Sequence, residues 1–567
     1  MKITADVFEA YLKCPTKCWL RSTAETSAGN TYSEWVKARN DSYRVNETRR
    51  LVAESPNDAV VLSPDMKNFK AAKWRLASSL AVWARMDFGV LESELHAMER
   101  VSSEGRGQHA QFIPVRFTFA NKLYRDDRLL LAFDALVLSE MLCCDVSCGK
   151  IVHGDDHATQ TVKTSALAGK VRKLIPKIAA LLASHSPPDL VLNRHCVECE
   201  FRDRCRQKAI EQDDLSQLWN MTEKERRKFN SKGIFTVKQL SYTFRARRRP
   251  KRLACKREKY HHSLKALAIR ERKIHIVGSP ELELEGTPVY LDVEGIPDRE
   301  FYYLIGIRVK TTEQVIQHSL WADSVDEEKR IWTDFLGILS GIENPVLVHY
   351  GGYETNFLKR MCSRHGEPVL IPPLAKIIKS AVNLLSFIFA KIYFPTYSNS
   401  LKEVLSSLGF MWSDTNLSGP NSIACRLEWE RSADSSLKRR LLTYNAEDCN
   451  GMEILTNFLY KLCHGDSSGT SQSAIDAIHV DRMKPLPPFI LINKDGAALP
   501  EFKTINGAAY WDYQRQRVYV RSSKIIKQAC QKTLRRKVTK LPVKHTLQFS
   551  APVSSSCCGS AAFFKGA

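Results

Sequence analysis

Two acidic residues interrupt an apolar run that is otherwise typical of a buried β-strand, and this pair constrains the chain more than any other feature. Within residues 289–295, Asp292 and Glu294 are two positions apart, so on a strand their side chains point to the same face. Two neighbouring carboxylates repel each other, and burying them without a partner costs free energy. A hard divalent cation such as Mg²⁺ or Mn²⁺ would remove that cost. The alternative is an edge strand whose two acids face solvent.

Two later segments carry further acids in a related pattern. Residues 346–350 form a short apolar run, and Glu354 follows just beyond its end. Residues 442–449 have a helical pattern in which Tyr444 and Asp448 are four apart, so these two side chains share one helix face. The order is therefore two acids on a strand, one acid after a later strand, and a tyrosine with an acid on a helix.

In this order and spacing the segments resemble the ribonuclease H-like exonucleases of the DEDD superfamily, tyrosine subclass. The YprB-type domain is the most similar, with its Asp-Val-Glu-Gly strand, His-Tyr-Gly-x-Tyr-Glu segment and Tyr-Asn-x-Glu-Asp helix. The resemblance implies that Asp292, Glu294 and Asp448 bind two Mg²⁺ or Mn²⁺ ions and that Tyr444 orients the attacking water or the scissile phosphate. Most DEDD exonucleases carry an Asn and an Asp in the second motif, whereas here Glu354 must serve, acting through water.

The overall charge of the chain points to a polyanionic partner. Lys and Arg number 84 against 62 Asp and Glu, a formal net charge of +22 over 567 residues, and nucleic acid is the simplest partner for such an excess. The first six residues lack the apolar core of a signal peptide, and no uncharged apolar run is long enough to span a membrane. We therefore expect a cytoplasmic protein without a membrane partner. In that compartment the 16 cysteines indicate metal binding or packing rather than disulfides.

Three of these cysteines are close in sequence. Cys196, Cys199 and Cys205 have the spacing Cys-x-x-Cys-x5-Cys, and thiolates so close together can bind one metal centre. Cys14, in a Cys-Pro-x-x-x-Trp-Leu stretch, is the best remote fourth ligand. This arrangement resembles the iron–sulfur nucleases of the RecB family, including CRISPR-associated exonucleases, and implies a 4Fe-4S cluster. A four-cysteine Zn²⁺ site and plain buried thiols are the alternatives.

The RecB-like resemblance also implies a nuclease site of the PD-(D/E)xK type before Cys196. Such a site needs an Asp and then Glu-x-Lys on a strand, to hold metal and activate water. In the best candidate strand, residues 112–118, Arg116 and Thr118 stand at the Glu and Lys positions. We therefore expect a RecB-like fold without activity at this site.

The middle and the end of the chain are predicted to contact nucleic acid. Residues 215–229 and 233–240 have the pattern of two helices joined at Gly233, similar to a degenerate helix-hairpin-helix, which offers backbone N–H groups to phosphate. Nine of the fifteen residues 245–259 are basic, which favours a linker that follows phosphates or a solvated face. The candidate contacts are Arg245, Arg247, Arg248, Arg249, Lys251 and Arg252. The end of the chain, residues 554–560 with Cys557 and Cys558, resembles the first knuckle of a truncated transposase-type zinc ribbon that has lost its Cys-x-x-Cys. Residues 515–544 before it carry eleven Lys or Arg and no acid.

These observations predict an α/β chain of four parts. The parts are a degenerate RecB-like domain with the cysteine-bound cluster (1–210), the helix-hairpin-helix-like module with its basic linker (211–260), a ribonuclease H-like domain with a mixed sheet (280–465) and the basic tail (487–567). The predicted function is a metal-dependent 3′–5′ exonuclease on DNA or RNA, with single-stranded ends as substrate. The alternative is a non-catalytic nucleic-acid-binding factor of a mobile element or repair complex. Protein partners are not indicated.

Overall fold

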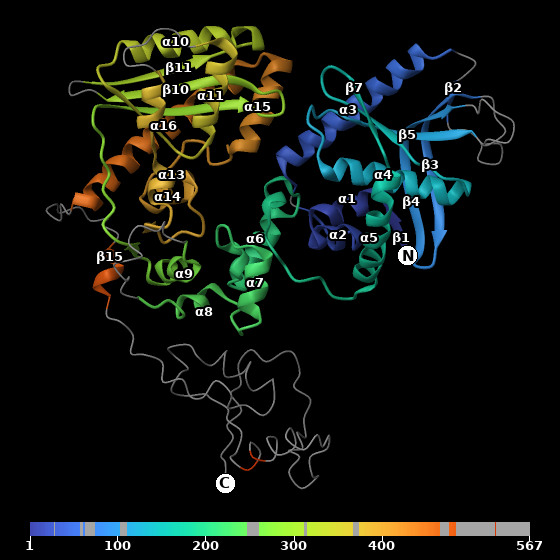
Figure 1. Ribbon diagram of the computed structural model, residues 1–567, viewed down its shortest axis with the longest axis horizontal. Coiled ribbons are helices and arrows are strands. Elements are labelled where there is room, and N and C mark those ends of the chain that lie inside the picture. The colour runs from blue at the N-terminus through green and yellow to red at the C-terminus, as the bar shows by residue number, and fades with distance from the viewer. Residues whose placement is uncertain are drawn as a thin grey trace. The chain divides into compact units, whose positions relative to one another are not determined.

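The computed structural model describes residues 1–27, 29–56, 60–62, 74–101, 110–246, 260–310, 314–366, 374–464 and 476–483, with the single positions 525 and 528. The fold is α/β, as predicted, with helices packed on separate sheets (Figure 1). Contacts divide the chain into a large unit, residues 1–223 with 236–483, and a small unit, residues 224–235 with 484–567. The predicted basic contacts from Arg247 to Arg252 and the zinc-ribbon-like cysteines lie outside the described residues.

The N-terminal part is built on a seven-stranded sheet. Its path is β2-β3-β4-β5-β6-β7, and β1 pairs with β4. The strands are β1 (Lys2–Thr4), β2 (Val60–Leu62), β3 (Leu76–Met86), β4 (Gly89–Val101), β5 (Gln111–Thr118), β6 (Gly149–His153) and β7 (Ala158–Val162). The helices are α1 (Ala5–Lys13), α2 (Pro15–Ser22), α3 (Thr31–Glu54), α4 (Arg125–Leu142) and α5 (Ser165–Ala183). Helix α4 packs on β3 to β6 and α3 on β4 and β5.

Alternation along β5 sends neighbouring side chains to different cores. Val115 and Phe117 belong to the core that α3 covers through Tyr43, whereas Arg116, between them, forms an ion pair with Asp134 of α4. The strand predicted over residues 112–118 is thus confirmed, and its period of two sends Arg116 toward α4.

The segment after the cysteine cluster is helical but more broken than predicted. It contains η3 (Arg194–Glu198), α6 (Arg202–Glu211), η4 (Leu215–Gln217), α7 (Glu223–Asn230), α8 (Val237–Ser241) and α9 (His262–Glu271). The single helix predicted over 215–229 is wrong, because Asn220 adopts a left-handed φ of 58° that a right-handed helix cannot continue. The turn at Gly233 is confirmed, with a φ of 77° that glycine adopts without strain.

The C-terminal part has a five-stranded mixed sheet in the order β11-β10-β9-β12-β13. β9, β10 and β11 are antiparallel neighbours, and β12 runs parallel to β9 and to β13. The strands are β9 (Thr287–Ile296), β10 (Phe301–Lys310), β11 (Val315–Trp321), β12 (Pro345–His349) and β13 (Val382–Asn383), and a small sheet joins β14 (Ile392–Tyr393), β8 (Ile274–Ile276) and β15 (Ala477–His479). The helices are η6 (Val325–Glu327), α10 (Glu328–Ser340), α11 (Tyr353–His365), α12 (Leu374–Ser380), α13 (Leu384–Ile388), α14 (Leu401–Ser407), α15 (Gly419–Ser432), α16 (Ser435–His464) and η7 (Val480–Arg482).

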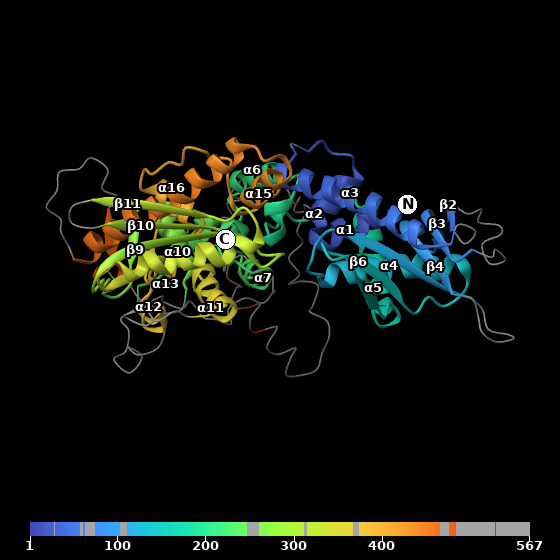
Figure 2. The same ribbon diagram turned by 90° about the horizontal axis from the view of Figure 1, so that it is seen from above.

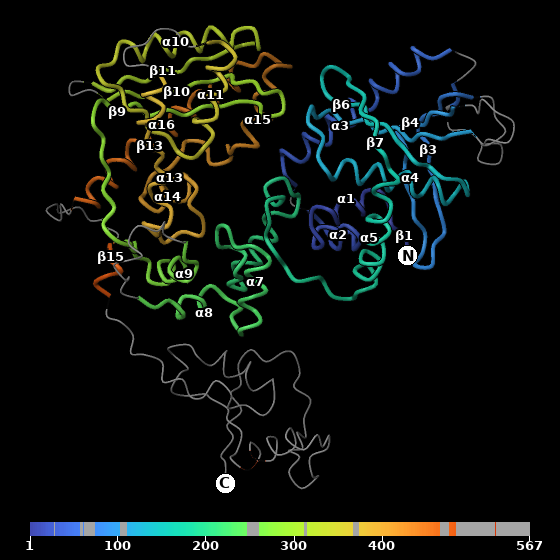
Figure 3. The backbone as a smooth tube through the Cα atoms, viewed as in Figure 1, coloured from blue at the N-terminus to red at the C-terminus, as the bar shows by residue number. Residues whose placement is uncertain are grey.

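Strand β9 lies at the centre of this sheet, between helices on both faces. On one face Tyr302 of β10 packs against Phe357 of α11; α16 packs along β9 and β10, on the other side of the strands from α11 (Figure 2). The chain can be followed from β9 to α16 in Figure 3. Helix α16 comes this close because β10 has a glycine at Gly306, where a Cβ would overlap the side chain of Asn445. Two acids on the central strand are therefore covered by a helix and not exposed at an edge.

A buried lysine fixes the loop that leads into α14. Lys265 of α9 is fully buried, and its Nζ donates to Phe394 O at 3.0 Å, Thr396 Oγ1 at 3.1 Å and Asn399 Oδ1 at 2.9 Å. Burial lowers the pKa of this lysine to about 7. Asn399, 3% exposed, is held in the interior of this loop by the bond from Lys265. In the described part of the chain no helix combines the length and apolar character needed to cross a membrane.

Candidate metal centre

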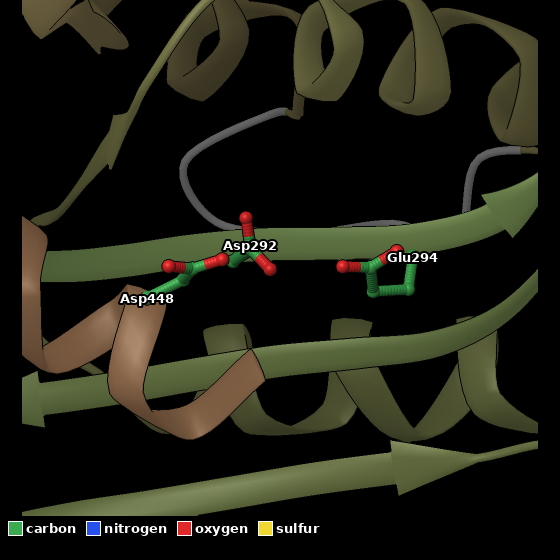
Figure 4. A group of neighbouring side chains, drawn as sticks. All are labelled: Asp292, Glu294 and Asp448. Carbon is green, nitrogen blue, oxygen red and sulfur yellow. The ribbon is translucent and has the colours of Figure 1, made fainter. Parts of the chain in front are cut away.

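Three carboxylates converge between β9 and α16. Asp292 and Glu294 project from the same strand and Asp448 points toward Asp292 from the helix (Figure 4). One oxygen from each lies within 4.8 Å of the others, and among the described residues this is the only group of three acids, histidines or cysteines so close together. Oxygen ligands in such a cluster suit a hard divalent cation. The predicted same-face arrangement of Asp292 and Glu294 is borne out.

Each of the three acids is oriented by a hydrogen bond from another element. Asn445 Nδ2 donates to Asp292 Oδ2 at 2.6 Å, and the Ser422 hydroxyl of α15 donates to Glu294 Oε2 at 2.9 Å. The indole Nε1 of Trp412 donates to Asp448 Oδ1 at 2.8 Å. These donors fix the carboxylate rotamers, as hydrogen-bond partners of ligating side chains do in metal sites.

The pKa values of the three acids are raised, chiefly because they are buried. Burial, followed by the charges of Asp448 and Glu294, raises the pKa of Asp292 well above its usual value. Burial and the Asp448 charge raise the pKa of Glu294 to about 8, and burial raises that of Asp448 to about 6. A cation bound between the three acids would remove the repulsion that contributes to these raised pKa values.

Tyr444 and Glu354 lie beside the three acids. Tyr444, 7% exposed, hydrogen-bonds Asp448, and burial raises its pKa well above that of a free tyrosine. Glu354 lies in the first turn of α11 and is also buried; its Oε2 is 3.5 Å from His349 Nδ1, and its charge contributes to the raised pKa of Asp292. The structure thus places all five predicted residues in one region, with Glu354 outside the closest group.

The structure adds residues that sequence reasoning did not assign. Asn445 stands inside the Tyr-Asn-x-Glu-Asp motif, so its place next to Tyr444 could have pointed to it. Trp412 and Ser422 lie in segments without a recognisable motif, and no sequence signal identifies them. Glu447, adjacent to Asp448, is not one of the three converging acids; its carboxylate accepts the Ser413 backbone N–H at 3.1 Å.

The four predicted cysteines also meet. Cys14 lies between α1 and α2, and it lines one cavity together with Cys196, Cys199 and Cys205. Burial, and after it the other three thiols, raises the pKa of Cys205 to about 11. Leu190, Leu192 and Phe201 give this cavity apolar walls. The remaining cysteine of this region, Cys18, is fully buried and packs in the core.

The predicted first nuclease position is occupied by an ion pair. Arg116 Nη2 donates to Asp134 Oδ1 at 3.0 Å and its Nε contacts Asp134 Oδ2, while the Ser93 hydroxyl donates to the same carboxylate. Asp134 is fully buried. Both carboxylate oxygens of Asp134 are therefore bound by donors from Arg116 and Ser93.

We expect Trp412→Phe to lower the Mn²⁺ affinity of the centre by about 10–100-fold, the usual effect of losing a hydrogen-bond partner of a metal ligand. Phenylalanine keeps the ring that packs against Phe410 but cannot donate to Asp448. Measuring Mn²⁺ affinity by calorimetry checks this. The control is Trp332→Phe, which removes an indole of α10 that donates to Gly366 O after the end of α11. Unchanged affinity in Trp412→Phe would show that Asp448 is held by other contacts.

Without metal, we expect the domain to lose stability as the pH rises from about 4 to about 8. The pKa of Glu294 is about 8 and that of Asp448 about 6 in the folded state, above the roughly 4 of unfolded acids. The folded state therefore binds more protons than the unfolded state in this window, and the free energy of unfolding falls with pH. Scanning calorimetry in EDTA should show a falling melting temperature, with a shallower fall in Asp292→Asn. A melting temperature that does not fall across this window, or the same slope in both proteins, would contradict the charge coupling.

One comparison with known proteins agrees with this geometry, and one found nothing. A comparison of the sequence with curated proteins gave no match. Residues 289–460, from β9 through most of α16, match the family model of the RNase H superfamily. Domains of this superfamily are usually nucleic-acid hydrolases and generally use Mg²⁺ or Mn²⁺. The part of the chain that carries Asp292, Glu294 and Asp448 is therefore an RNase H-like domain.

Proposed function

We propose that this protein is a metal-dependent nuclease, acting as a 3′–5′ exonuclease on the single-stranded ends of DNA or RNA. The observation that carries the proposal is the convergence of three carboxylates, two half-buried on β9 and one buried on α16, within 4.8 Å of one another, inside a domain that matches the RNase H superfamily. Tyr444, hydrogen-bonded to Asp448, supports the tyrosine-subclass assignment.

In this proposal each residue has a separate role. Asp292, Glu294 and Asp448 hold two divalent ions, and Glu354 acts through water from the edge of the site. The ions, when bound, activate a water and stabilise the leaving oxygen. Tyr444 orients the water or the scissile phosphate. Asn445, Ser422 and Trp412 keep the three acids in ligating rotamers.

The test is digestion of single strands labelled at the 5′ or the 3′ end. DNA and RNA are each incubated with purified full-length protein in Mg²⁺, Mn²⁺ or EDTA, with Asp292→Ala as control. We expect 5′-labelled strands to shorten stepwise only with metal, and Asp292→Ala to be inactive. Binding without any cleavage would favour the non-catalytic binding factor of a mobile element or repair complex.

We further propose that residues 1–210 form a RecB-like domain, inactive as a nuclease, that holds a 4Fe-4S cluster on Cys14, Cys196, Cys199 and Cys205. All four thiols line one cavity with apolar walls. A four-cysteine Zn²⁺ site is the alternative that the same four thiols allow.

Elemental analysis distinguishes the two cofactors. We expect iron and acid-labile sulfide in the purified protein, brown in colour, and loss of both in Cys199→Ser. Stoichiometric zinc without iron would contradict the cluster. The proposal also covers the rest of the chain. The nuclease domain is residues 280–465. A phosphate-contacting module with its basic linker precedes it at residues 211–260, and a basic tail follows at residues 487–567.

A further inference from the structure

A lysine stands at the edge of the metal centre. Lys402 belongs to the first turn of α14. Its Nζ lies 4.7 Å from the centre of the Tyr444 ring and 5.4 Å from that of Trp412, the two rings that hydrogen-bond Asp448. Its positive charge lowers the pKa of Asp448 and of Glu294. The ammonium group is therefore close enough to act on whatever the three acids bind.

Lys402 is not the salt-bridge partner of any acid in the described part of the chain. None of the described carboxylate oxygens comes within the 4.0 Å of an ion pair with its Nζ, and its one hydrogen-bond acceptor among these residues is the Leu417 carbonyl. An ammonium group has three N–H donors, so two remain for a ligand. A lysine that served only to neutralise the acids would bond to one of them directly.

The charges at the centre also favour an anion next to Lys402. A divalent cation between Asp292, Glu294 and Asp448 would be repelled by the ammonium group. An anion placed between the cation and Lys402 is attracted by both and removes that repulsion. In a nuclease, the substrate places a phosphate group at this point. Lysine binds phosphate as a compact point charge.

We propose that Lys402 binds the phosphate group of the nucleic-acid substrate at the edge of the Asp292–Glu294–Asp448 centre. This inference rests on the proposed function. Cation–π contacts with Tyr444 and Trp412 and the bond to Leu417 hold the side chain in place, and a non-bridging phosphate oxygen accepts one of its remaining donors. Lys402 acts through its charge and forms no covalent bond.

The test uses two ligands of opposite charge. Full-length wild type, Lys402→Met and Lys402→Arg are titrated calorimetrically with Mn²⁺ alone, and then with thymidine 5′-monophosphate in saturating Mn²⁺. The matched control is Lys438→Met, because Lys438 also lies over two aromatic rings but pairs with Asp323. Cleavage of the single-strand substrate is measured in parallel.

We expect Lys402→Met to bind Mn²⁺ as tightly as wild type or more tightly, because a repelling charge is gone. It should bind the nucleotide at least about tenfold more weakly, as for a lost charge-assisted hydrogen bond, with kcat/KM reduced in proportion. Lys402→Arg should recover part of the nucleotide affinity, and Lys438→Met should resemble wild type. This opposite response to the two ligands is one that a merely structural role would not produce.

Three outcomes would overturn the inference. Unchanged nucleotide affinity in Lys402→Met would show that Lys402 does not contact the phosphate. A parallel loss of Mn²⁺ and nucleotide binding would show that its role is structural. Wild type that binds neither Mn²⁺ nor nucleotide overturns both this inference and the proposed function. If the wild type binds both ligands but does not cleave, only the proposed nuclease activity is overturned. The change in nucleotide affinity in Lys402→Met then still decides the inference.

Discussion

Asp448→Asn is expected to reduce cleavage to background, a larger loss than Tyr444→Phe will cause. Asp448 contributes a charged oxygen to the group of three within 4.8 Å, so its loss removes charge that holds the divalent ions. Tyr444 positions water or phosphate, and positioned groups of that kind contribute roughly 10²–10⁴-fold. Single-turnover cleavage rates of the two variants, measured beside wild type on one labelled strand, compare the two losses directly.

Both variants should keep the fold, which makes melting curves informative. Asparagine retains an Oδ1 that accepts from Trp412, and it removes one of three repelling charges, so the metal-free melting temperature of Asp448→Asn should rise. Saturating Mn²⁺ should stabilise wild type, by about 2.7 kcal/mol at a hundred times the Kd, and stabilise Asp448→Asn less. If Asp448→Asn digests the strand at the wild-type rate and gains the same stability from Mn²⁺, the metal site lies elsewhere.

Arg116→Ala is expected to destabilise the N-terminal part strongly and to leave cleavage unchanged. The substitution leaves Asp134, which is fully buried, without its charge partner, and breaking a buried pair in this way costs about 3–5 kcal/mol. Hydrogen exchange of peptides from β3 to β6 measures the local free energy of opening in the full-length protein. The same samples are assayed for cleavage.

The control removes both charges. Arg116→Met combined with Asp134→Leu leaves no unpaired ion, and replacing a buried pair by apolar side chains is often neutral, so most of the stability should return. Arg116→Ala could lose cleavage, and the double variant could fail to restore it. That result would show that this ion pair contributes to the reaction. The proposal that the first domain is inactive would then be wrong.

The sequence determined the parts of the centre that follow from local periodicity. Because side chains alternate on a strand and repeat at four residues on a helix, Asp292 and Glu294 had to share one face, and Tyr444 had to share one with Asp448. Both arrangements are confirmed, as are β5, the turn at Gly233 and the α/β class. Local spacing also grouped Cys196, Cys199 and Cys205. The helical spacing of residues 215–229 wrongly predicted one continuous helix, because the left-handed backbone at Asn220 interrupts the pattern.

Only the tertiary structure decided which groups meet across elements. Whether Glu447 or Asp448 faces the strand depends on how α16 packs, and the close approach at Gly306 fixes that rotation. Trp412, Ser422 and Lys402 reach the centre from segments that carry no motif, since a hydrogen bond or a cation–π contact requires only a donor in the right place and not a repeated spacing. The packing of α4 on β5 likewise brings Asp134 into contact with Arg116. Periodicity constrains the direction of a side chain on its own element, whereas its partner is set by long-range packing, which no local pattern records.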